Sequence, residues 1–239
     1  MLSLLSGALL WEVAARWFHW SFFPPLSSVA VTLYRLTARG LILANLGRSL
    51  LSLAAGYGLA VVIGSGVGLL MGRYRFVSSL LEPALHALLA TPKVAFVPVV
   101  YALFGLSRST QVAVVFLNAV FIIAINAMAG IRGVGAGSVE MARSFGASER
   151  QVFWRVLLPG SLPLTMAGLR LGMGQAVKGM ITGEMFIAYF GLGALLRDLG
   201  GRFDSAGVFA VLLVVVIIAL LCTAVIQMVE RRVTAWTGG

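Results

Sequence analysis

The chain has 239 residues, of which 60% are hydrophobic and only 11% are charged, and its mean hydropathy is +1.00. Soluble domains carry about 25% charged residues, so this composition excludes an ordinary soluble protein and indicates a polytopic membrane protein. The formal net charge of +10 resides mostly in arginines between apolar segments, which favours a role in membrane orientation over nucleic-acid binding. The single cysteine, Cys222, excludes an intrachain disulfide.

Six stretches of the chain are apolar over about the 20 residues that a membrane helix needs. They are residues 2–22, 46–72, 80–106, 109–129, 164–189 and 207–229. We therefore predict an all-α polytopic membrane protein with about six transmembrane helices in one domain, residues 1–239. The first segment has no basic residue before its apolar run, so we interpret it as a membrane helix and not as a secretory signal peptide.

Polar residues within and after the first segment predict local structure. Glu12 and Arg16 are spaced i, i+4 and are expected to form an ion pair. The connection over residues 24–42 begins with two prolines, which indicate a turn, and can carry a surface amphipathic helix at about residues 29–36.

The third segment contains two sites where we expect the helix to break. Pro83 is one, and the Thr91-Pro92-Lys93 sequence is the other. The second break either lines a transport pathway or marks the cytoplasmic start of a shorter helix, because irregular backbone at membrane depth must face protein or water.

Glycines recur at four-residue spacing in the second and fifth segments. They are Gly64, Gly68 and Gly72, and then the pairs Gly168 and Gly172, and Gly179 and Gly183. Such faces let membrane helices approach closely. We interpret them as packing within one bundle, with a specific subunit interface as the alternative.

A charged loop between the fourth and fifth segments sets the predicted orientation. Its arginines are Arg132, Arg143, Arg150 and Arg155. Because cytoplasmic loops are enriched in basic residues, we expect this loop and both termini to be cytoplasmic.

The same loop is predicted to form two short helices. Ser138 is expected to cap the first, which ends near Phe145, and Gly146 supplies the residue that closes it. Ser148, with Gln151 three residues later, predicts a capping box at the start of the second. Pro159 and Pro163 are expected to stop that helix and restart the chain towards the membrane.

This loop resembles the EAA motif of ABC importer permeases, E-A-A-x3-G-x9-I-x-L-P. The matching residues are Glu140, Ala142, Gly146, Val156, Leu158 and Pro159, with Met141 in place of the first alanine and Val156 in place of the isoleucine. Three further stretches, LLWEVAARW, TPKVAFVPVVYALFGLSRST and GEMFIAYFGLGALL, resemble the nitrate/sulfonate/taurine-type permeases.

The resemblance implies the transmembrane subunit of a type I ABC importer, with a coupling loop at about residues 131–163. Those six motif residues would then couple it to two copies of an ATP-binding subunit, which bind ATP and Mg. It further implies a second, identical permease subunit, an extracytoplasmic substrate-binding protein and a place in the bacterial inner membrane. The chain itself is expected to be non-catalytic, without cofactor or metal, and its substrate to be a small anion such as nitrate, a sulfonate, taurine or a related organic acid.

Two charged residues lie within the fifth segment. Lys178 and Glu184 are about 9 Å apart along a helix, too far to pair directly. Lys178 either serves an anionic substrate in the pathway, or snorkels or pairs with an acid on a neighbouring helix. Glu184 resembles a glutamate that the family carries near the outer half of the pathway. Its alternative role is a structural hydrogen bond to the turn at residues 191–193.

Other classes of function fit less well. An ion-coupled secondary transporter or channel could use Lys178 and Glu184, but it leaves the charged loop unexplained. A membrane-embedded enzyme is disfavoured because the chain has only two histidines and one cysteine. There is no phosphate-binding G-x-x-x-x-G-K-[ST] loop, so the chain is not its own ATPase by that route.

Overall fold

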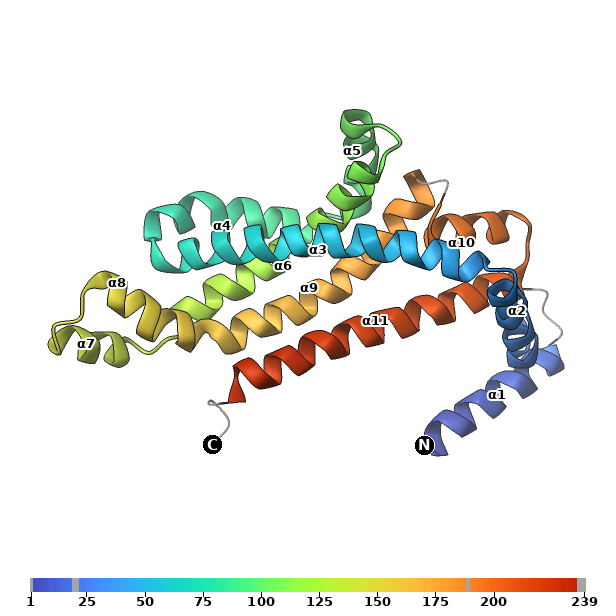
Figure 1. The fold of residues 1–239 in the computed structure, drawn as a ribbon, viewed down its shortest axis with the longest axis horizontal. Coiled ribbons are helices and arrows are strands. Elements are labelled where there is room, and N and C mark those ends of the chain that lie inside the picture. The colour runs from blue at the N-terminus through green and yellow to red at the C-terminus, as the bar shows by residue number, and fades with distance from the viewer. Residues whose placement is uncertain (1, 19–21, 188–189, 236–239) are drawn as a thin grey trace.

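The computed structural model describes residues 2–18, 22–187 and 190–235, and nearly all of them lie in helices (Figure 1). No strand occurs among these residues, which confirms the predicted all-α class. In chain order the elements are α1 (Leu2–Phe18), α2 (Leu26–Ala38), α3 (Leu41–Arg73), α4 (Arg75–Ala90), the 3-10 turn η1 (Lys93–Phe96), α5 (Val97–Phe104), α6 (Arg108–Arg132), α7 (Ala136–Ser144), α8 (Glu149–Val152), the π-helical turn η2 (Phe153–Leu157), α9 (Leu158–Ile187), α10 (Leu192–Gly201) and α11 (Ser205–Val233).

Four helices in the described part of the chain are long and apolar enough to cross a membrane. They are α3, α6, the continuous helix that comprises α8, η2 and α9, and α11. The bent pair of α4 and η1–α5 adds a fifth if it counts as one span. The first predicted segment forms α1, but its 17 residues extend only about 25 Å, less than the roughly 30 Å of a hydrocarbon core.

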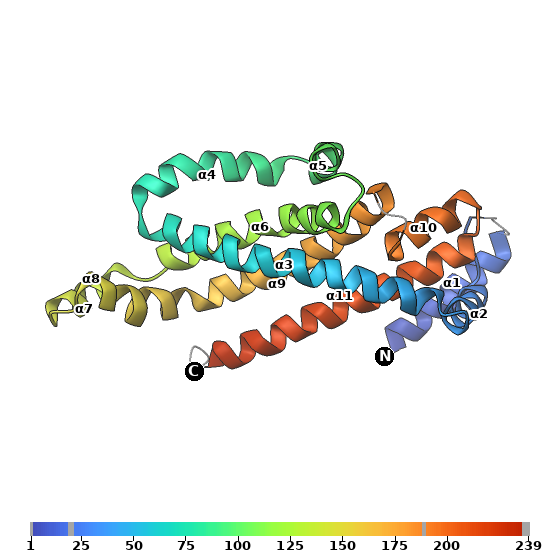
Figure 2. The same cartoon turned by 45° about the horizontal axis from the view of Figure 1, so that its top comes forward.

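The centre of the molecule is a bundle of α3, α6 and α9 (Figures 1 and 2), in which α6 packs along both of the other helices. The recurring glycines of α3 and α9 face α6. A Cβ added at Gly64 would lie 2.9 Å from the carbonyl oxygen of Val120, and one at Gly179 would lie 2.8 Å from the Cβ of Asn118. These glycines therefore pack within one bundle, as predicted, and they bring the helix backbones close together.

The third predicted segment is bent, and only one of its two expected breaks is present. The chain bends by 99° between α4 and the η1–α5 segment, and the break falls at Thr91-Pro92. Pro83 lies inside α4 and does not end it, so that expectation was wrong. Without water to satisfy a freed backbone group, continuing the helix leaves fewer of its hydrogen bonds unmade than ending it would.

The amino-terminal helices lie at the opposite end of the molecule from α7 and α8 (Figure 1). The predicted Glu12–Arg16 pair is present, and the Glu12 carboxylate also accepts a hydrogen bond from Ser27 Oγ at 2.8 Å. The predicted amphipathic helix is α2, which buries Val29 and Leu36 in an apolar cluster with α10 and α11. Among the other helices, α1 has its main contacts with α2.

We expect the contact between α3 and α6 to have no room for a methyl group at Gly68. A Cβ there would overlap the carbonyl oxygen of Ala124 and lie 2.8 Å from the Cβ of Ala127. Gly68→Ala should therefore destabilise the bundle by about 1–3 kcal/mol, a typical cost of overpacking, and lower the midpoint of thermal unfolding in detergent.

Gly66 on the same helix is the matched control, because a Cβ at that position meets no atom within 4 Å. Gly66→Ala should leave the unfolding midpoint unchanged or raise it slightly, since alanine has the higher helix propensity. Equal midpoints for the two variants would contradict close packing at Gly68.

Candidate functional site

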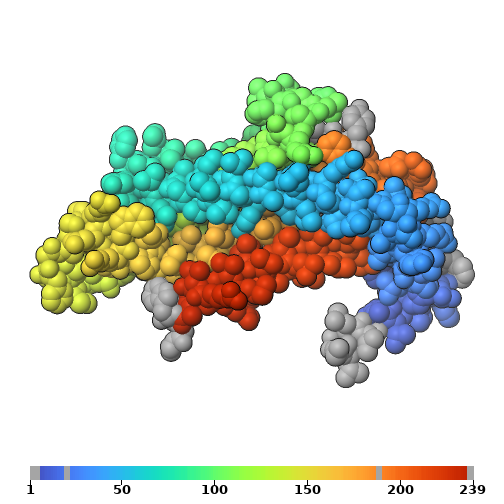
Figure 3. All heavy atoms as spheres, in the orientation of Figure 1, coloured from blue at the N-terminus to red at the C-terminus, as the bar shows by residue number. Residues whose placement is uncertain are grey.

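The predicted coupling loop forms a projection at one end of the molecule, built from α7, Gly146 and α8 (Figures 1 and 3). We call residues 136–152 the knuckle. Its first helix starts earlier than expected: Gly135 is the N-cap, without a side-chain cap, so the prediction of Ser138 as a cap was wrong. Glu140 consequently lies in the second turn of α7, and its side chain is exposed.

Gly146 closes α7 with a Schellman motif, which explains why the loop has glycine at this position. Its φ is +78°, in the left-handed region. The N–H of Gly146 donates to the carbonyl of Arg143 at 2.8 Å, and that of Ala147 donates to the carbonyl of Ala142 at 3.1 Å. These are the two hydrogen bonds of the motif. Ala142 and Ala147 both pack against the buried apolar cluster of Ile131, Val152 and Leu157. The side chain at position 142 therefore lies between this turn and the cluster, where a small residue fits.

The second helix begins as predicted but does not end where prolines were expected to end it. Ser148 and Gln151 form the complete capping box. The helix then continues from Glu149 through α9, so the expected stop at Pro159 and Pro163 was wrong. The physical reason is the π turn η2, which precedes Pro159: the N–H of Leu158 donates to the carbonyl of Phe153, five residues back. A proline in a regular α-helix clashes with the carbonyl four residues before it and cannot donate a hydrogen bond to it. The wider π turn shifts the hydrogen-bond pattern just before Pro159, so the helix continues past this residue.

One side of the knuckle is fastened to the bundle. Val152 and Leu157 are buried against Ile131 of α6. Glu149 forms one ion pair with Arg73 at the end of α3 and a second, at 2.9 Å, with Arg143 of α7. The carboxylate is 55% exposed, so solvent screens both pairs, and the buried apolar contacts contribute more to the attachment.

The other side of the knuckle is exposed and carries large apolar side chains. Met141 is 59% exposed and Phe145 is 85% exposed. The motif residues Val156, Leu158 and Pro159 are half-buried where the helix enters the bundle. A projection that is anchored on one face and apolar on the other can bind a partner and transmit its movement to α9 and α3.

Glu184 lies far from the knuckle, buried at the other end of α9. Its side chain is 1% exposed, and Oε2 accepts hydrogen bonds from Ser49 Oγ and from the N–H of Gly193, each at 2.9 Å. The hydrogen bond to the 191–193 turn is therefore present. Lys178, by contrast, is exposed, and no hydrogen bond or ion pair joins it to another described residue. The structure does not bring the two together.

The start of α10 is held by three side chains, two of which sequence reasoning missed. The N–H of Gly191 donates to Asn45 Oδ1 at 2.8 Å, that of Leu192 to Ser49 Oγ at 3.0 Å, and that of Gly193 to Glu184. The first N–H groups of a helix have no acceptor within that helix. The three side chains therefore accept hydrogen bonds from N–H groups that would otherwise be unpaired in the bilayer. A polar asparagine and serine one turn apart in α3 were the available signal.

No group of three or more His, Cys, Asp or Glu side chains that could hold a metal ion occurs within residues 2–18, 22–187 and 190–235. Other polar side chains of the bundle join one helix to another. Ser52 Oγ donates to Gln111 Oε1 at 2.8 Å, and Arg132 pairs with Glu82 of α4 at 2.8 Å.

Comparison with known proteins assigns the family of this all-helical membrane bundle. Residues 60–235 match the family described as binding-protein-dependent transport system inner membrane component. The chain belongs to this family and is the transmembrane subunit of an ABC importer.

Two similar proteins agree with this assignment, and a solved structure has a similar fold. The chain is 33% identical to the taurine transport system permease protein TauC of Escherichia coli K12, over 82% of this chain and 70% of that protein. It is 30% identical to the formylaminopyrimidine transport permease protein ThiX of Halalkalibacterium halodurans, over 95% and 91% of the two chains. The fold is similar to that of the MetNI methionine ABC transporter in an inward-facing conformation, with a TM-score of 0.69 and 22% identity, over 81% of this chain and 96% of that chain.

We expect Ser49 to be needed for the stability of the α3–α10 contact. Ser49→Ala removes the hydroxyl that both donates to Glu184 and accepts from Leu192, and it leaves buried polar groups unpaired at a cost of about 1–3 kcal/mol. The midpoint of thermal unfolding in detergent should fall.

Ser65→Ala is the matched control, because Ser65 lies on the same helix and makes no hydrogen bond to another helix among the described residues. A midpoint for Ser49→Ala no lower than that of Ser65→Ala would show that the hydrogen bonds to Ser49 contribute little.

Proposed function

We propose that two copies of this chain form the translocation pathway of an importer driven by two copies of a separate ATP-binding subunit, which bind ATP and Mg. The observation that carries the proposal is the knuckle, which joins an exposed apolar face to α3, α6 and α9 through buried contacts. An external binding protein delivers the substrate, and the chain itself catalyses no reaction. The whole of residues 1–239 acts as one permease domain in the bacterial inner membrane, with both termini and the loop at about residues 131–163 in the cytoplasm.

The coupling residues have distinct roles in this proposal. Glu140 is exposed on α7, beside Met141 and Phe145, and offers a carboxylate to the ATP-binding subunit. Ala142 and Gly146 shape the turn that sets the angle between α7 and α8. Closure of the two ATP-binding subunits then moves the knuckle as a rigid body and rocks the membrane helices.

Val156, Leu158 and Pro159 continue this connection into the membrane. They lie in and just after the π turn, between the knuckle and the straight part of α9. Because the helix is unbroken there, a displacement of the knuckle reaches α9 without a flexible loop between them. We infer that this continuity transmits the movement of the ATP-binding subunit.

The substrate that this proposal assigns is a small anion, such as taurine, a sulfonate, nitrate or a related organic acid. Several similar proteins bear the names of taurine and aliphatic sulfonate permeases. Lys178 places a positive charge on the exposed face of α9, within the membrane-spanning part of the helix. A charge at that depth needs protein or water beside it, and in the proposed dimer this face of α9 lines the translocation pathway. Glu184 then acts at the outer half of the pathway by fixing the start of α10.

The proposed coupling role makes Gly146 sensitive to substitution. A side chain in the left-handed conformation costs about 1–2 kcal/mol, so Gly146→Val should change the angle between α7 and α8 while the membrane bundle stays folded. Co-purification of the ATP-binding subunit and ATP-driven uptake in vesicles should both fall about tenfold.

Gly137→Val is the control for this experiment. Gly137 lies in α7, its φ is not in the left-handed region, and a Cβ there meets no atom within 4 Å. If Gly146→Val keeps wild-type co-purification and uptake, the knuckle is not the coupling element and the proposal loses its main support.

The role proposed for Lys178 requires its positive charge. Lys178→Ala should raise the KM for uptake of an anionic substrate about tenfold without changing co-purification of the ATP-binding subunit, whereas Lys178→Arg should keep most of the uptake. Measurements of uptake kinetics in vesicles compare the Lys178→Ala and Lys178→Arg variants. Unchanged kinetics in Lys178→Ala would return the residue to a lipid-facing, snorkelling role.

A further inference from the structure

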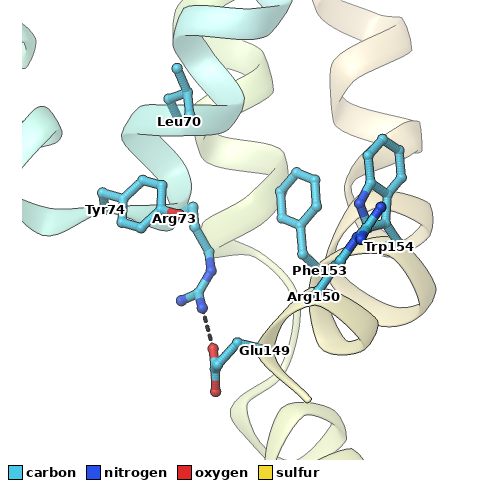
Figure 4. A pocket seen from close by; sticks show the side chains of 7 residues that line it. All are labelled: Leu70, Arg73, Tyr74, Glu149, Arg150, Phe153 and Trp154. Atoms are coloured by element: carbon cyan, nitrogen blue, oxygen red, sulfur yellow. Dashed lines mark hydrogen bonds and ion pairs between the residues drawn. The ribbon is translucent and has the colours of Figure 1, made fainter. Parts of the chain in front are cut away.

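A pocket of about 320 Å³ lies between the end of α3 and the start of the helix that leads into α9 (Figure 4). Its two walls come from segments that are far apart in the sequence. The residues that line it are Leu70, Arg73 and Tyr74 on one side, and Glu149, Arg150, Phe153 and Trp154 on the other. Figure 4 shows Arg73 directed towards Glu149, whereas the rings of Phe153 and Trp154 point the opposite way.

The length of α3 places this pocket at the level of the lipid headgroups. The helix has 33 residues and is about 50 Å long, whereas the hydrocarbon core is about 30 Å thick. With the core centred on α3, its last turn lies several ångströms beyond the hydrocarbon. Tyrosine and tryptophan are enriched at this depth, and Tyr74 and Trp154, which are 53% and 58% exposed, contribute one to each wall.

The charges at the pocket leave a net positive potential. The single carboxylate, Glu149, is already shared by Arg73 and Arg143. Arg150 makes no ion pair or hydrogen bond with another described residue, and it is exposed. Three arginines therefore accompany one acid at or beside the pocket, and the guanidinium of Arg150, which lies beside Trp154 in Figure 4, remains available to a ligand.

We propose that this pocket binds the phosphate of an anionic phospholipid of the cytoplasmic leaflet. Arg150 provides the charge that holds the phosphate, with a guanidinium geometry suited to its oxygens. Leu70 and Phe153 offer apolar contact to the start of the acyl chains. Basic pockets at the cytoplasmic ends of membrane helices suit such headgroups. The bound lipid contacts both α3 and α8, the two elements that the Arg73–Glu149 pair also joins.

The binding can be tested directly with lipids of matched acyl chains. Delipidated permease, alone and together with its ATP-binding subunit, is titrated with phosphatidylglycerol or phosphatidylcholine in mild detergent, and bound lipids are counted by native mass spectrometry. We expect the wild-type chain to retain phosphatidylglycerol in preference to phosphatidylcholine. Arg150→Gln should weaken phosphatidylglycerol binding about fivefold, the effect of one basic side chain near a charged surface.

Arg75→Gln is the matched control. It removes the same charge from an exposed arginine at the same end of the molecule, but Arg75 does not line the pocket. It should leave the binding of phosphatidylglycerol unchanged. Arg150 has no protein partner to lose, so both variants are expected to fold, and their elution as monodisperse species checks this.

Four results would overturn the proposal. They are equal binding of the two lipids, equal losses in Arg150→Gln and Arg75→Gln, full displacement of phosphatidylglycerol by millimolar inorganic phosphate, and binding that disappears when the ATP-binding subunit is present. The last would assign the pocket to the interface with that subunit. Because the titration of the permease alone needs no partner, its result is independent of the proposed coupling role.

Discussion

Close contact between helix backbones is the constraint on which the rest of this structure depends. In a bilayer the hydrophobic effect does not drive helices together, so packing between small residues takes its place. Gly64 and Gly68 of α3 and Gly172 and Gly179 of α9 lie against α6 from two sides. The helices can approach this closely only because these positions lack a Cβ. The resulting core fixes the positions from which both the knuckle and the outer polar network extend.

The knuckle is mechanically a continuation of this core. Its second helix is continuous with α9, and the π turn precedes Pro159 without a break in the helix. Val152 and Leu157 bury the base of the knuckle against α6. Force applied to α7 therefore acts on all three central helices, including α3 through the Arg73–Glu149 pair. A flexible loop of the same length would absorb a displacement of that kind, whereas a helix anchored at its base passes it on.

The opposite end of α9 is organised by hydrogen bonds in addition to apolar packing. Asn45, Ser49 and Glu184 take the first three free N–H groups at the start of α10. Because unpaired backbone groups are costly away from water, this arrangement fixes where the chain turns after α9. The same helix thus carries the proposed coupling surface at one end and a rigidly held turn at the other.

The sequence by itself determined the features that depend on neighbouring residues. The Ser148–Gln151 capping box, the left-handed Gly146, the break at Thr91-Pro92 and the Glu12–Arg16 pair all need only partners within a few positions. Local signals failed where distant packing competes with them. Pro83 and Pro159 predicted helix ends, but the helix continues past Pro83, where ending it in lipid would leave hydrogen bonds unmade, and past Pro159, which follows the π turn. Only the tertiary structure could show that Glu184 bonds to Ser49, 135 residues away, because the approach of α3 to α9 depends on the glycine contacts that both make with α6.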